Sequence, residues 1–299
     1  MIGDHTIAAR EVPLGGLRQL TVHRTLPSRS LPTIGAWCFV DHFGPTDEAM
    51  TVLPHPHTGL QTVTWPVSGE IRHRDSLGSD VVLKPGELNL MTSGDGVSHS
   101  EFSVDAAEPM HGIQLWVALP DADRRGRAGF EHHADLPRVE GEGWQATVLV
   151  GEFVGGRSAA TVYSPLMGAE VRLEAGTHVL PLDPAFEHGL LAVDSPLTIE
   201  GEQVEHRLLR YLAPGRDQVE VSIQGPATVM LLGGEPFEEE LVMWWNFIGR
   251  THEDIVRARE DWQAGAARFG HVEGHDGQVI PAPPMPDLRL RPRRRHPIG

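Results

Sequence analysis

The chain has 299 residues and a mass of 32.8 kDa, which is long enough for one large domain or for two of about 150 residues. Its 25 basic residues against 41 acidic ones leave a formal net charge of −16, which argues against a nucleic-acid-binding surface. The single cysteine, Cys38, excludes an intrachain disulfide and a cysteine-based zinc cluster. The 17 histidines, in contrast, offer many candidate metal ligands.

No targeting or membrane signal stands out in the sequence. The N-terminus lacks the basic segment and following apolar stretch of a secretory signal. The longest apolar stretches, such as residues 229–232, are far shorter than the roughly 20 residues of a membrane-spanning helix. We therefore expect a cytoplasmic protein that has no membrane partner and does not bind DNA directly.

Short runs rich in Val, Leu, Thr and Trp recur between glycine and proline turn signals. Short strands at such regular spacing predict an all-β sandwich or barrel. The expected strands are residues 60–66, 81–83, 113–119, 147–150, 170–173, 189–193, 219–223 and 228–232.

Helical signals are confined to two places. Thr251 and Asp254 form a pattern typical of a capping box, and apolar residues follow at helical spacing, which predicts a helix over about 251–264. We expect a shorter helix near residues 121–127. The aromatic run 244–247 is expected to fasten the C-terminal segment to a barrel.

The last residues form a tail of different composition. Residues 281–286 are dense in proline, and a basic cluster follows at Arg289, Arg291 and residues 293–295. A basic tail can contact nucleic acid or an acidic partner. We favour the other interpretation, a solvated and partly disordered terminus.

Glycine patterns in the two halves indicate a repeated unit. The segment 57–86 contains H-T-G-L, S-G-E and P-G-E, and the segment 187–216 contains E-H-G-L, E-G-E and P-G-R at similar spacing. With Gly59 and Gly189 as anchors, the offset is 130 residues, which predicts two copies of one small β-barrel with a boundary near 125–145. Chance similarity between two turn-rich segments is the alternative.

Two short motifs carry the strongest chemical signal, His55-Pro-His57 and His99-Ser-Glu101. Residues i and i+2 of a β-strand point to the same face, so the two side chains of each motif project together. Two such strands side by side present three imidazoles and one carboxylate. This set suits a divalent first-row metal and leaves positions for water or substrate.

The face that holds the first motif is expected to continue along the chain through Gln61, Val63 and Trp65. The alternative interpretation of the histidines is that they are partly exposed polar residues at a barrel mouth.

The same segments resemble the motifs of the pirin family. The similar runs are H-P-H-T-G-L-Q-T-V-T at 55–64, G-E-I-R-H-R-D-S-L-G at 69–78, P-G-E-L-N-L-M-T-S-G at 85–94, G-V-S-H-S-E at 96–101 and G-I-Q-L-W-V at 112–117. The resemblance covers roughly residues 8–270. It implies a member of the cupin superfamily, an all-β bicupin with two jelly-roll β-barrels in tandem and a short C-terminal helix.

The resemblance also implies an arrangement of domains and ligands. Residues 1–130 would form the metal-binding N-terminal cupin domain, and residues 131–299 a C-terminal cupin domain without a metal site. The family's metal ligands correspond to His55, His57, His99 and Glu101. The implied cofactor is one divalent metal per chain, Fe(II) first, with Mn, Co, Ni or Cu as alternatives.

Gln61 departs from the family pattern, because many pirins have Glu at this position. A neutral amide is a poorer ligand, so we expect Gln61 behind the ligands or in the substrate pocket. Trp65, Met91 and Gln114 are further candidates for the pocket wall, although ordinary barrel packing is the favoured role of Trp65 and Met91. Asp95 stands where many relatives carry a basic residue.

The second barrel is expected to have lost its metal site. The glycine anchors align Ala185, Glu187, Thr228 and Met230 with the four ligand positions, and these residues do not form a comparable ligand set.

Some pirins have quercetin 2,3-dioxygenase activity, so the resemblance implies a flavonoid-like substrate and O2. A metal would lower the pKa of a bound flavonol hydroxyl, and Glu101, the fourth ligand, would leave the metal to act as the catalytic base that takes its proton. The alternative is a non-enzymatic regulator that responds to metal or redox state and binds a protein partner, either a transcription factor or a metabolic enzyme.

Overall fold

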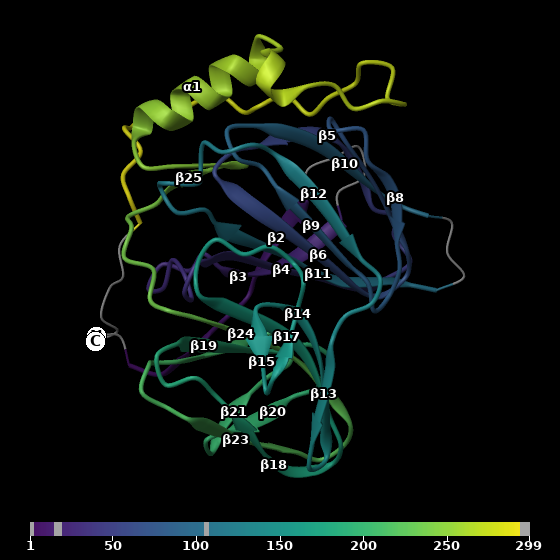
Figure 1. The fold of residues 1–299 in the computed structure, drawn as a ribbon, viewed down its shortest axis with the longest axis vertical. Helices are drawn as coiled ribbons and strands as arrows, with labels where there is room; N and C mark the ends of the chain where they lie inside the picture. The colour runs from purple at the N-terminus through teal and green to yellow at the C-terminus, as the bar shows by residue number, and fades with distance from the viewer. Residues whose placement is uncertain (1–2, 15–19, 105–107, 294–299) are drawn as a thin grey trace.

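The computed structural model describes residues 3–14, 20–104 and 108–293. Two β-barrels lie against each other, the first drawn in purple and blue and the second in teal and green (Figure 1). Each barrel consists of a large and a small antiparallel sheet. The expected all-β fold with two barrels in tandem is confirmed. Each predicted strand overlaps an observed strand and extends beyond it by at most one residue, although several observed strands begin up to four residues earlier.

The first barrel is formed mainly by the N-terminal half of the chain. Its large sheet has the strand order β12 (Gly129–His133), β9 (Leu88–Thr92), β6 (Leu60–Ser68), β11 (Met110–Ala118), β4 (Trp37–Thr46), β3 (Leu20–Leu26) and β2 (Arg10–Leu14). Its small sheet has the order β5 (Thr51–His57), β10 (Val97–Ser103), β7 (Ile71–Asp75) and β8 (Asp80–Leu83).

The second barrel repeats this arrangement. Its large sheet has the order β1 (His5–Ile7), β22 (Leu209–Leu212), β19 (Glu187–Ala192), β24 (Ala227–Gly234), β17 (Leu166–Leu173), β14 (Trp144–Val150) and β13 (Arg138–Gly141). Its small sheet has the order β18 (Gly176–Pro181), β23 (Gln218–Ile223), β20 (Leu197–Ile199) and β21 (Glu202–Val204). Two ribbons complete the strands, β15 (Glu152–Phe153) with β16 (Gly156–Arg157) and β25 (Val242–Trp244) with β26 (Phe247–Gly249).

The chain exchanges edge strands between the barrels. Strand β1, at the N-terminus, pairs with β22 of the second barrel, whereas β12 pairs with β9 of the first. The expected division after residue 130 therefore falls inside β12. The C-terminal segment returns to the first barrel, where β26 contacts β5.

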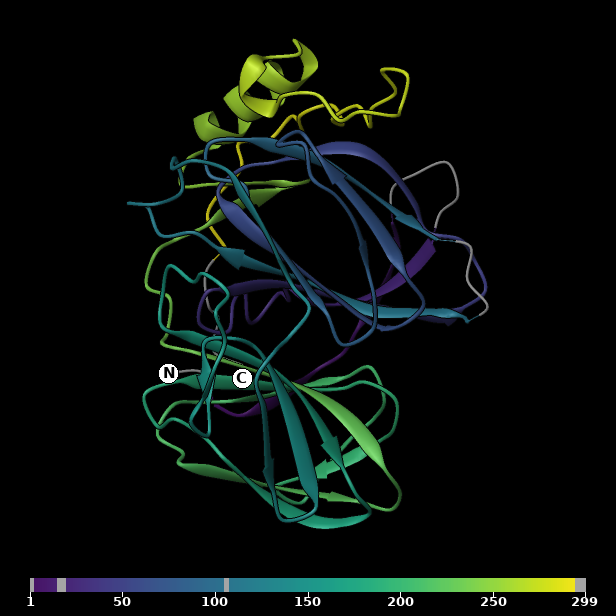
Figure 2. The same ribbon diagram turned by 45° about the vertical axis from the view of Figure 1, so that its right-hand side comes forward.

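The outer faces of the two large sheets form the contact between the barrels (Figure 2). Val63 and Leu115 of the first barrel share one buried apolar cluster with Leu191 and Met230 of the second. Trp65 adds a polar link, since its indole N–H donates to the carboxylate of Glu170 at 2.7 Å. Because a large apolar interface resists relative motion of domains, the second barrel supports the first from behind.

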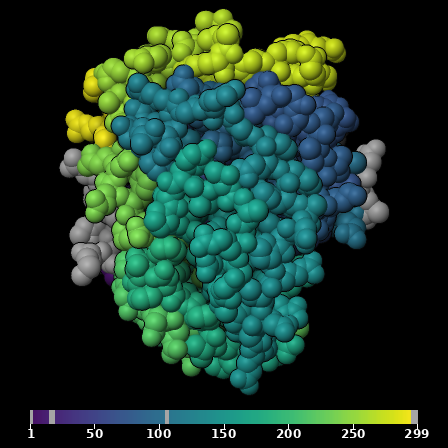
Figure 3. All heavy atoms as spheres, viewed as in Figure 1, coloured from purple at the N-terminus to yellow at the C-terminus, as the bar shows by residue number. Residues whose placement is uncertain are grey.

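A helix and the residues after it cover one end of the first barrel, and Figure 3 shows them as a layer of yellow-green and yellow atoms. Helix α1 (His252–Gln263) begins with the predicted capping box, in which Thr251 accepts the N–H of Asp254 at 3.1 Å and the Asp254 carboxylate accepts the N–H of Thr251 at 3.2 Å. A short 3-10 helix, η1 (Ala267–Phe269), follows. Within the described residues, we find no helix with the length and apolar character needed to cross a membrane.

One expectation about irregular segments is wrong, and another holds only in part. Residues 121–127 form turns instead of a helix, closed by a bond from the N–H of Gly126 to the carbonyl of Asp123. The tail is largely exposed up to residue 293, as expected, but it is ordered against the first barrel, since Ala282 is buried and the backbone N–H of Arg293 donates to the carbonyl of Leu241. The remaining arginines of the basic cluster, 294 and 295, lie outside the described residues.

Candidate metal centre

Three neighbouring strands of the first barrel's small sheet each carry two buried polar residues at positions i and i+2. The pairs are His55 and His57 on β5, His99 and Glu101 on β10, and His73 and Asp75 on β7. In the register of the sheet, His99 lies opposite His55 on one side and opposite Asp75 on the other. Because alternate residues of a strand point to the same face, these three pairs bring six polar side chains together on the inner face of the small sheet.

The three histidines that the sequence selects lie together. The ligand nitrogens of His55, His57 and His99 are all within 4.8 Å of one another, and Nε2 of His57 is 3.1 Å from Nε2 of His99. Nδ1 of His55 lies 2.9 Å from the carbonyl of Leu53. Because a carbonyl only accepts, this Nδ1 carries the proton, and Nε2 of His55 keeps a free lone pair for a metal.

Burial keeps these imidazoles neutral. It lowers the pKa of His55 to about 4. It also lowers the pKa values of His57 and His99 well below the ordinary value, and the neighbouring histidines add to the effect. A neutral imidazole is the form that coordinates a metal, so the residues present fit a divalent first-row metal.

Glu101 lies beside this cluster on β10. Its carboxylate is within 4.8 Å of ligand nitrogens of His73 and His99, although it does not group with all three of the other predicted ligands. The hydroxyl of Thr64 donates to Oε1 of Glu101 at 3.0 Å, and burial raises the pKa of the carboxyl group. Glu101 and the three histidines all line the same cavity.

This cavity has a volume of about 430 Å³. Its walls include Phe39, Gln114 and Trp116 from the large sheet, together with Trp244 and Trp245 from the C-terminal segment. The rings of Phe39 and Trp116 are stacked, with centroids 3.9 Å apart and planes at 11°. The cavity is therefore of ligand size, with metal-binding groups on one wall and aromatic surfaces on others.

One side of the cavity is charged. The Arg24 guanidinium forms two 2.7 Å bonds to the two carboxylate oxygens of Asp41, and both residues line the cavity. Arg24 also lies over the ring of Phe39, 4.2 Å from its centroid. Arg293, from the tail, is a further lining residue.

The structure divides the four residues predicted for the pocket wall. Gln114 lines the cavity, whereas Gln61, Trp65 and Met91 do not. The amide of Gln61 donates to the hydroxyl of Thr92 at 2.9 Å and to the backbone carbonyl of Thr161 at 3.0 Å. Trp65 belongs to the apolar cluster between the barrels, and Met91 is fully buried in β9, as expected from ordinary packing.

The expected continuous face from His57 through Gln61 and Trp65 is wrong because of one turn. Gly59 separates β5 from β6 with a φ of +73°, and a Cβ at this position would lie 2.3 Å from the carbonyl oxygen of Ile248. The turn passes the chain from the small sheet to the large sheet, so the strict alternation is interrupted. On β6 it is Thr64 that faces the metal-binding residues.

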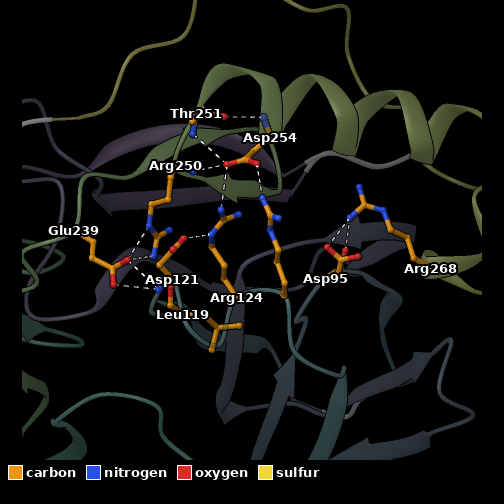
Figure 4. A network of polar contacts seen from close by, with 10 residues as sticks. Asp95, Leu119, Asp121, Arg124, Glu239, Arg250, Thr251, Asp254 and Arg268 are labelled. Atoms are coloured by element: carbon orange, nitrogen blue, oxygen red, sulfur yellow. Dashed lines mark hydrogen bonds and ion pairs between the residues drawn. The ribbon is translucent and has the colours of Figure 1, made fainter.

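Ion pairs fasten the C-terminal segment beside this site (Figure 4). Arg250 pairs with Glu239 and donates to the carbonyl of Leu119 at 2.7 Å. Arg268 lies 3.4 Å from the carboxylate of Asp95, in the turn that leads into β10. Asp95, which departs from the basic residue of many relatives, therefore has a partner of opposite charge within this chain.

The sequence prediction did not include several residues of this region, among them two polar residues of β7 and two tryptophans of the C-terminal segment. His73 and Asp75 have the same i, i+2 spacing as the two predicted motifs. The sequence His73-Arg-Asp75 could therefore have been recognised as a third motif of this kind. Trp244 and Trp245 line the cavity from a segment far along the chain. They were expected only to fasten that segment, because nothing in the local sequence shows which barrel they cover.

The second barrel lacks a comparable ligand group in the part of the chain that the structure describes. Strands β18 and β23 occupy the places of β5 and β10, and their buried residues include Leu180, Val219 and Val221. The ring nitrogens of His178, also on β18, lie 3.1 and 2.7 Å from the backbone carbonyls of Glu142 and Glu174. This histidine is thus held by the backbone.

The glycine anchors align the two barrels incorrectly. Gly59 lies in the turn between β5 and β6, whereas Gly189 lies inside β19, the counterpart of β6. The residues aligned with the ligand positions, Ala185, Glu187, Thr228 and Met230, therefore do not lie on β18 or β23. Turn glycines mark the spacing of the repeat but do not determine the register of its strands.

The fold and the ligand cluster together define a bicupin in which one barrel has a polar interior. The sequence profile of the pirin family matches residues 19–117, and that of the pirin C-terminal cupin domain matches residues 168–270. The chain belongs to the pirin family.

Relatives match along nearly the full length of the chain. A Pseudomonas aeruginosa protein that carries the provisional name quercetin 2,3-dioxygenase is 44% identical over 285 residues, covering 94% of this chain and 90% of the relative. A pirin-like protein of Caulobacter vibrioides is 36% identical over 293 residues, covering 94% and 99%. The crystal structure of a quercetin 2,3-dioxygenase from Acinetobacter baumannii superposes with a TM-score of 0.93 at 39% identity, covering 98% of both chains.

Proposed function

We propose that this pirin is a metal-dependent dioxygenase that opens the ring of a flavonol-like substrate with O2. One observation carries the proposal: a buried histidine cluster with an adjacent carboxylate forms one wall of a 430 Å³ cavity with aromatic walls. The activity named for the Acinetobacter baumannii relative supports this choice. The cofactor in this proposal is one divalent first-row metal per chain, with iron as the first candidate.

The proposed ligands are His55, His57, His99 and Glu101. When bound, the metal supplies Lewis acidity that lowers the pKa of a substrate hydroxyl and a redox partner for O2. Glu101 would leave the metal to accept the hydroxyl proton, and the hydroxyl of Thr64 donates to Oε1 of this carboxylate at 3.0 Å. Because proton transfer requires the base within hydrogen-bond reach of the hydroxyl, the position of Glu101 on the cavity wall is the relevant feature.

The other walls orient the substrate. The stacked pair of Phe39 and Trp116 gives the cavity an apolar aromatic wall against which an aromatic molecule can pack. The Gln114 amide is a hydrogen-bonding group on the same wall. Trp244 and Trp245 border the cavity from the C-terminal segment and shield its contents from water.

Turnover by the purified, iron-loaded protein tests this proposal. We expect consumption of quercetin and O2, and we expect its loss in His57→Ala and in Glu101→Ala. His178→Ala is the matched control, because His178 lies on the counterpart strand of the second barrel and its ring nitrogens lie at hydrogen-bond distance from two backbone carbonyls. This control should keep the native rate per folded protein.

The contrary result is full metal occupancy without turnover on a panel of flavonoids. It would overturn the enzymatic proposal and support the second candidate, a metal- or redox-responsive protein that acts by binding a protein partner.

A further inference from the structure

We propose that Asp75 and His73 are positioning residues that act on His99 through a buried relay of hydrogen bonds. The inference rests on the proposed role of His99 as a metal ligand. Neither Asp75 nor His73 lines the cavity, so both act from behind the ligands and do not touch substrate.

The relay follows from three contacts among fully buried side chains. Nε2 of His99 faces the cluster, 3.1 Å from Nε2 of His57, and its Nδ1 lies 3.4 Å from Nδ1 of His73. Nε2 of His73 lies 3.1 Å from Oδ2 of Asp75. The other oxygen of Asp75 accepts two backbone N–H groups of the following turn, at 2.9 and 3.0 Å.

These contacts determine where the protons are. A carboxylate only accepts hydrogen bonds, so His73 carries its proton on Nε2 and its Nδ1 is a free acceptor. His99 then donates from Nδ1, and its Nε2 keeps the lone pair on the side of His55 and His57. The relay therefore selects the one tautomer of His99 that can bind a metal in the cluster.

The surroundings also prevent the relay from rotating. Asp75 and His73 lie directly opposite His99 and Glu101 in the pairing of β7 with β10. The ring of Phe130 stacks on His73, with centroids 4.4 Å apart and planes at 16°. An outer partner of this kind orients its ligand and raises its basicity, and its loss typically costs about 10- to 100-fold in metal affinity.

The alternative role of His73 is that of a metal ligand. Its nitrogen lies within 4.8 Å of ligand atoms of both His99 and Glu101. A metal there, together with one on the other side of His99, would require His99 to lose both ring protons. The relay requires only the neutral imidazole, so it is the chemically simpler arrangement.

The test measures the affinity of the full-length chain for nickel(II) by competition with a chelator. In Asp75→Asn, the amide can present N–H groups to His73 and favour its other tautomer, whose Nδ1–H then opposes the Nδ1–H of His99. We expect a loss of about 10- to 100-fold in nickel affinity.

A matched pair at His73 separates hydrogen bonding from packing. His73→Phe keeps a ring against Phe130 but removes both relay contacts, whereas His73→Asn keeps an acceptor near Nδ1 of His99. We expect the Phe variant to lose about as much nickel affinity as Asp75→Asn, and the Asn variant to recover part of it. This pair also decides the matter if Asp75→Asn fails to fold, since Asp75 holds the turn.

Three results would overturn the relay. The first is nickel affinity within twofold of the native chain in a folded His73→Phe variant. The second is binding of two nickel ions by the native chain with loss of one in His73→Phe, which would make His73 a ligand. The third is a native chain that binds no nickel, which would contradict both the relay and the proposed metal centre. Absence of flavonol turnover with the expected affinity pattern would contradict only the proposed enzymatic function and would support the relay.

Discussion

The two barrels have the same strand order and very different interiors. The second is filled by apolar side chains, and Leu180, Leu190, Val219 and Val221 are completely buried there. The first has polar pairs on three strands of its small sheet and a 430 Å³ cavity beside them. Complete burial of one apolar side chain stabilises a fold by about 1.5–3 kcal/mol, whereas a buried polar group costs free energy unless it is partnered. The interior of the second barrel therefore favours stability, whereas the interior of the first leaves polar groups beside space for a ligand.

The contact between the barrels explains how the first barrel can keep an interior that is only partly filled. The outer faces of both large sheets are apolar and share one core, so the packed second barrel holds the large sheet of the first barrel in place. The first barrel can then keep a polar, partly hollow interior without losing its shape.

The largest expected effect concerns metal binding by corresponding strands of the two barrels. His57→Ala on β5 removes a proposed ligand and should lower metal affinity by more than the 10- to 100-fold typical of an outer residue. His178→Ala on β18 should leave metal affinity unchanged, because His178 contacts backbone carbonyls. Titration of both variants with nickel(II) checks this difference, and equal losses would show that the barrels are not divided as described.

The next effect concerns packing. Leu180→Ala in the filled second barrel should lower the free energy of unfolding by about 2–5 kcal/mol, because it leaves a cavity in a packed core. Gln114→Ala in the first barrel should cost less than about 1 kcal/mol, since its side chain already borders open space. Denaturant unfolding of both variants measures the contrast, and a larger cost at Gln114 would contradict it.

A pH effect of smaller size is expected from the second barrel. Burial lowers the pKa of His188 to about 4, from an ordinary value of 6.5. The neutral form is therefore favoured in the folded state, and the contribution to stability is complete above pH 6.5 and is lost as the pH falls towards 4. Between pH 7 and pH 4.5, this loss should amount to about 2–3 kcal/mol.

The variant His188→Gln isolates the contribution of this histidine. Its unfolding free energy should fall less steeply with decreasing pH than that of the native chain, by the same 2–3 kcal/mol or so over this range. Parallel pH dependences in the two proteins would show that His188 does not titrate as its burial indicates.

The smallest effect is expected at the ion pair between the C-terminal segment and the turn before β10. The Asp95 side chain is 57% exposed and Arg268 is 22% exposed, so Arg268→Gln should cost at most about 1 kcal/mol of stability. We expect faster amide hydrogen exchange in residues 93–96, with the second barrel unaffected. Unchanged exchange in this turn would show that the ion pair does not hold it.

The parts of the site that depend on local geometry could be predicted from the sequence. The i, i+2 spacing placed His55 with His57 and His99 with Glu101, because alternation within one strand is fixed by the backbone. The capping box at Thr251 was equally local and was confirmed. The repeated glycine pattern and the resemblance to pirins together predicted the pair of barrels, which no single motif specifies.

Two kinds of feature of the site could not be predicted from local sequence patterns. One depends on the chain passing from the small sheet to the large sheet, and the other on segments far apart in the sequence. The turn at Gly59 ended the expected face of Gln61 and Trp65, because alternation holds only within one strand. Arg293 and Trp245 reach the cavity from the C-terminal segment, and only the folded arrangement brings them there. A basic, proline-rich composition indicated a solvated and partly disordered tail. Its described part is indeed mostly exposed, but Ala282 and the backbone bond of Arg293 to Leu241 hold it on the first barrel.

In the proposed arrangement, one metal ion binds in the first barrel and none binds in the second. Anomalous diffraction from crystals of the metal-loaded protein distinguishes the two barrels. We expect one anomalous peak per chain, bonded to Nε2 of His55, His57 and His99 and to the carboxylate of Glu101. A peak inside the second barrel, or metal-loaded crystals with no peak at this cluster, would contradict this arrangement.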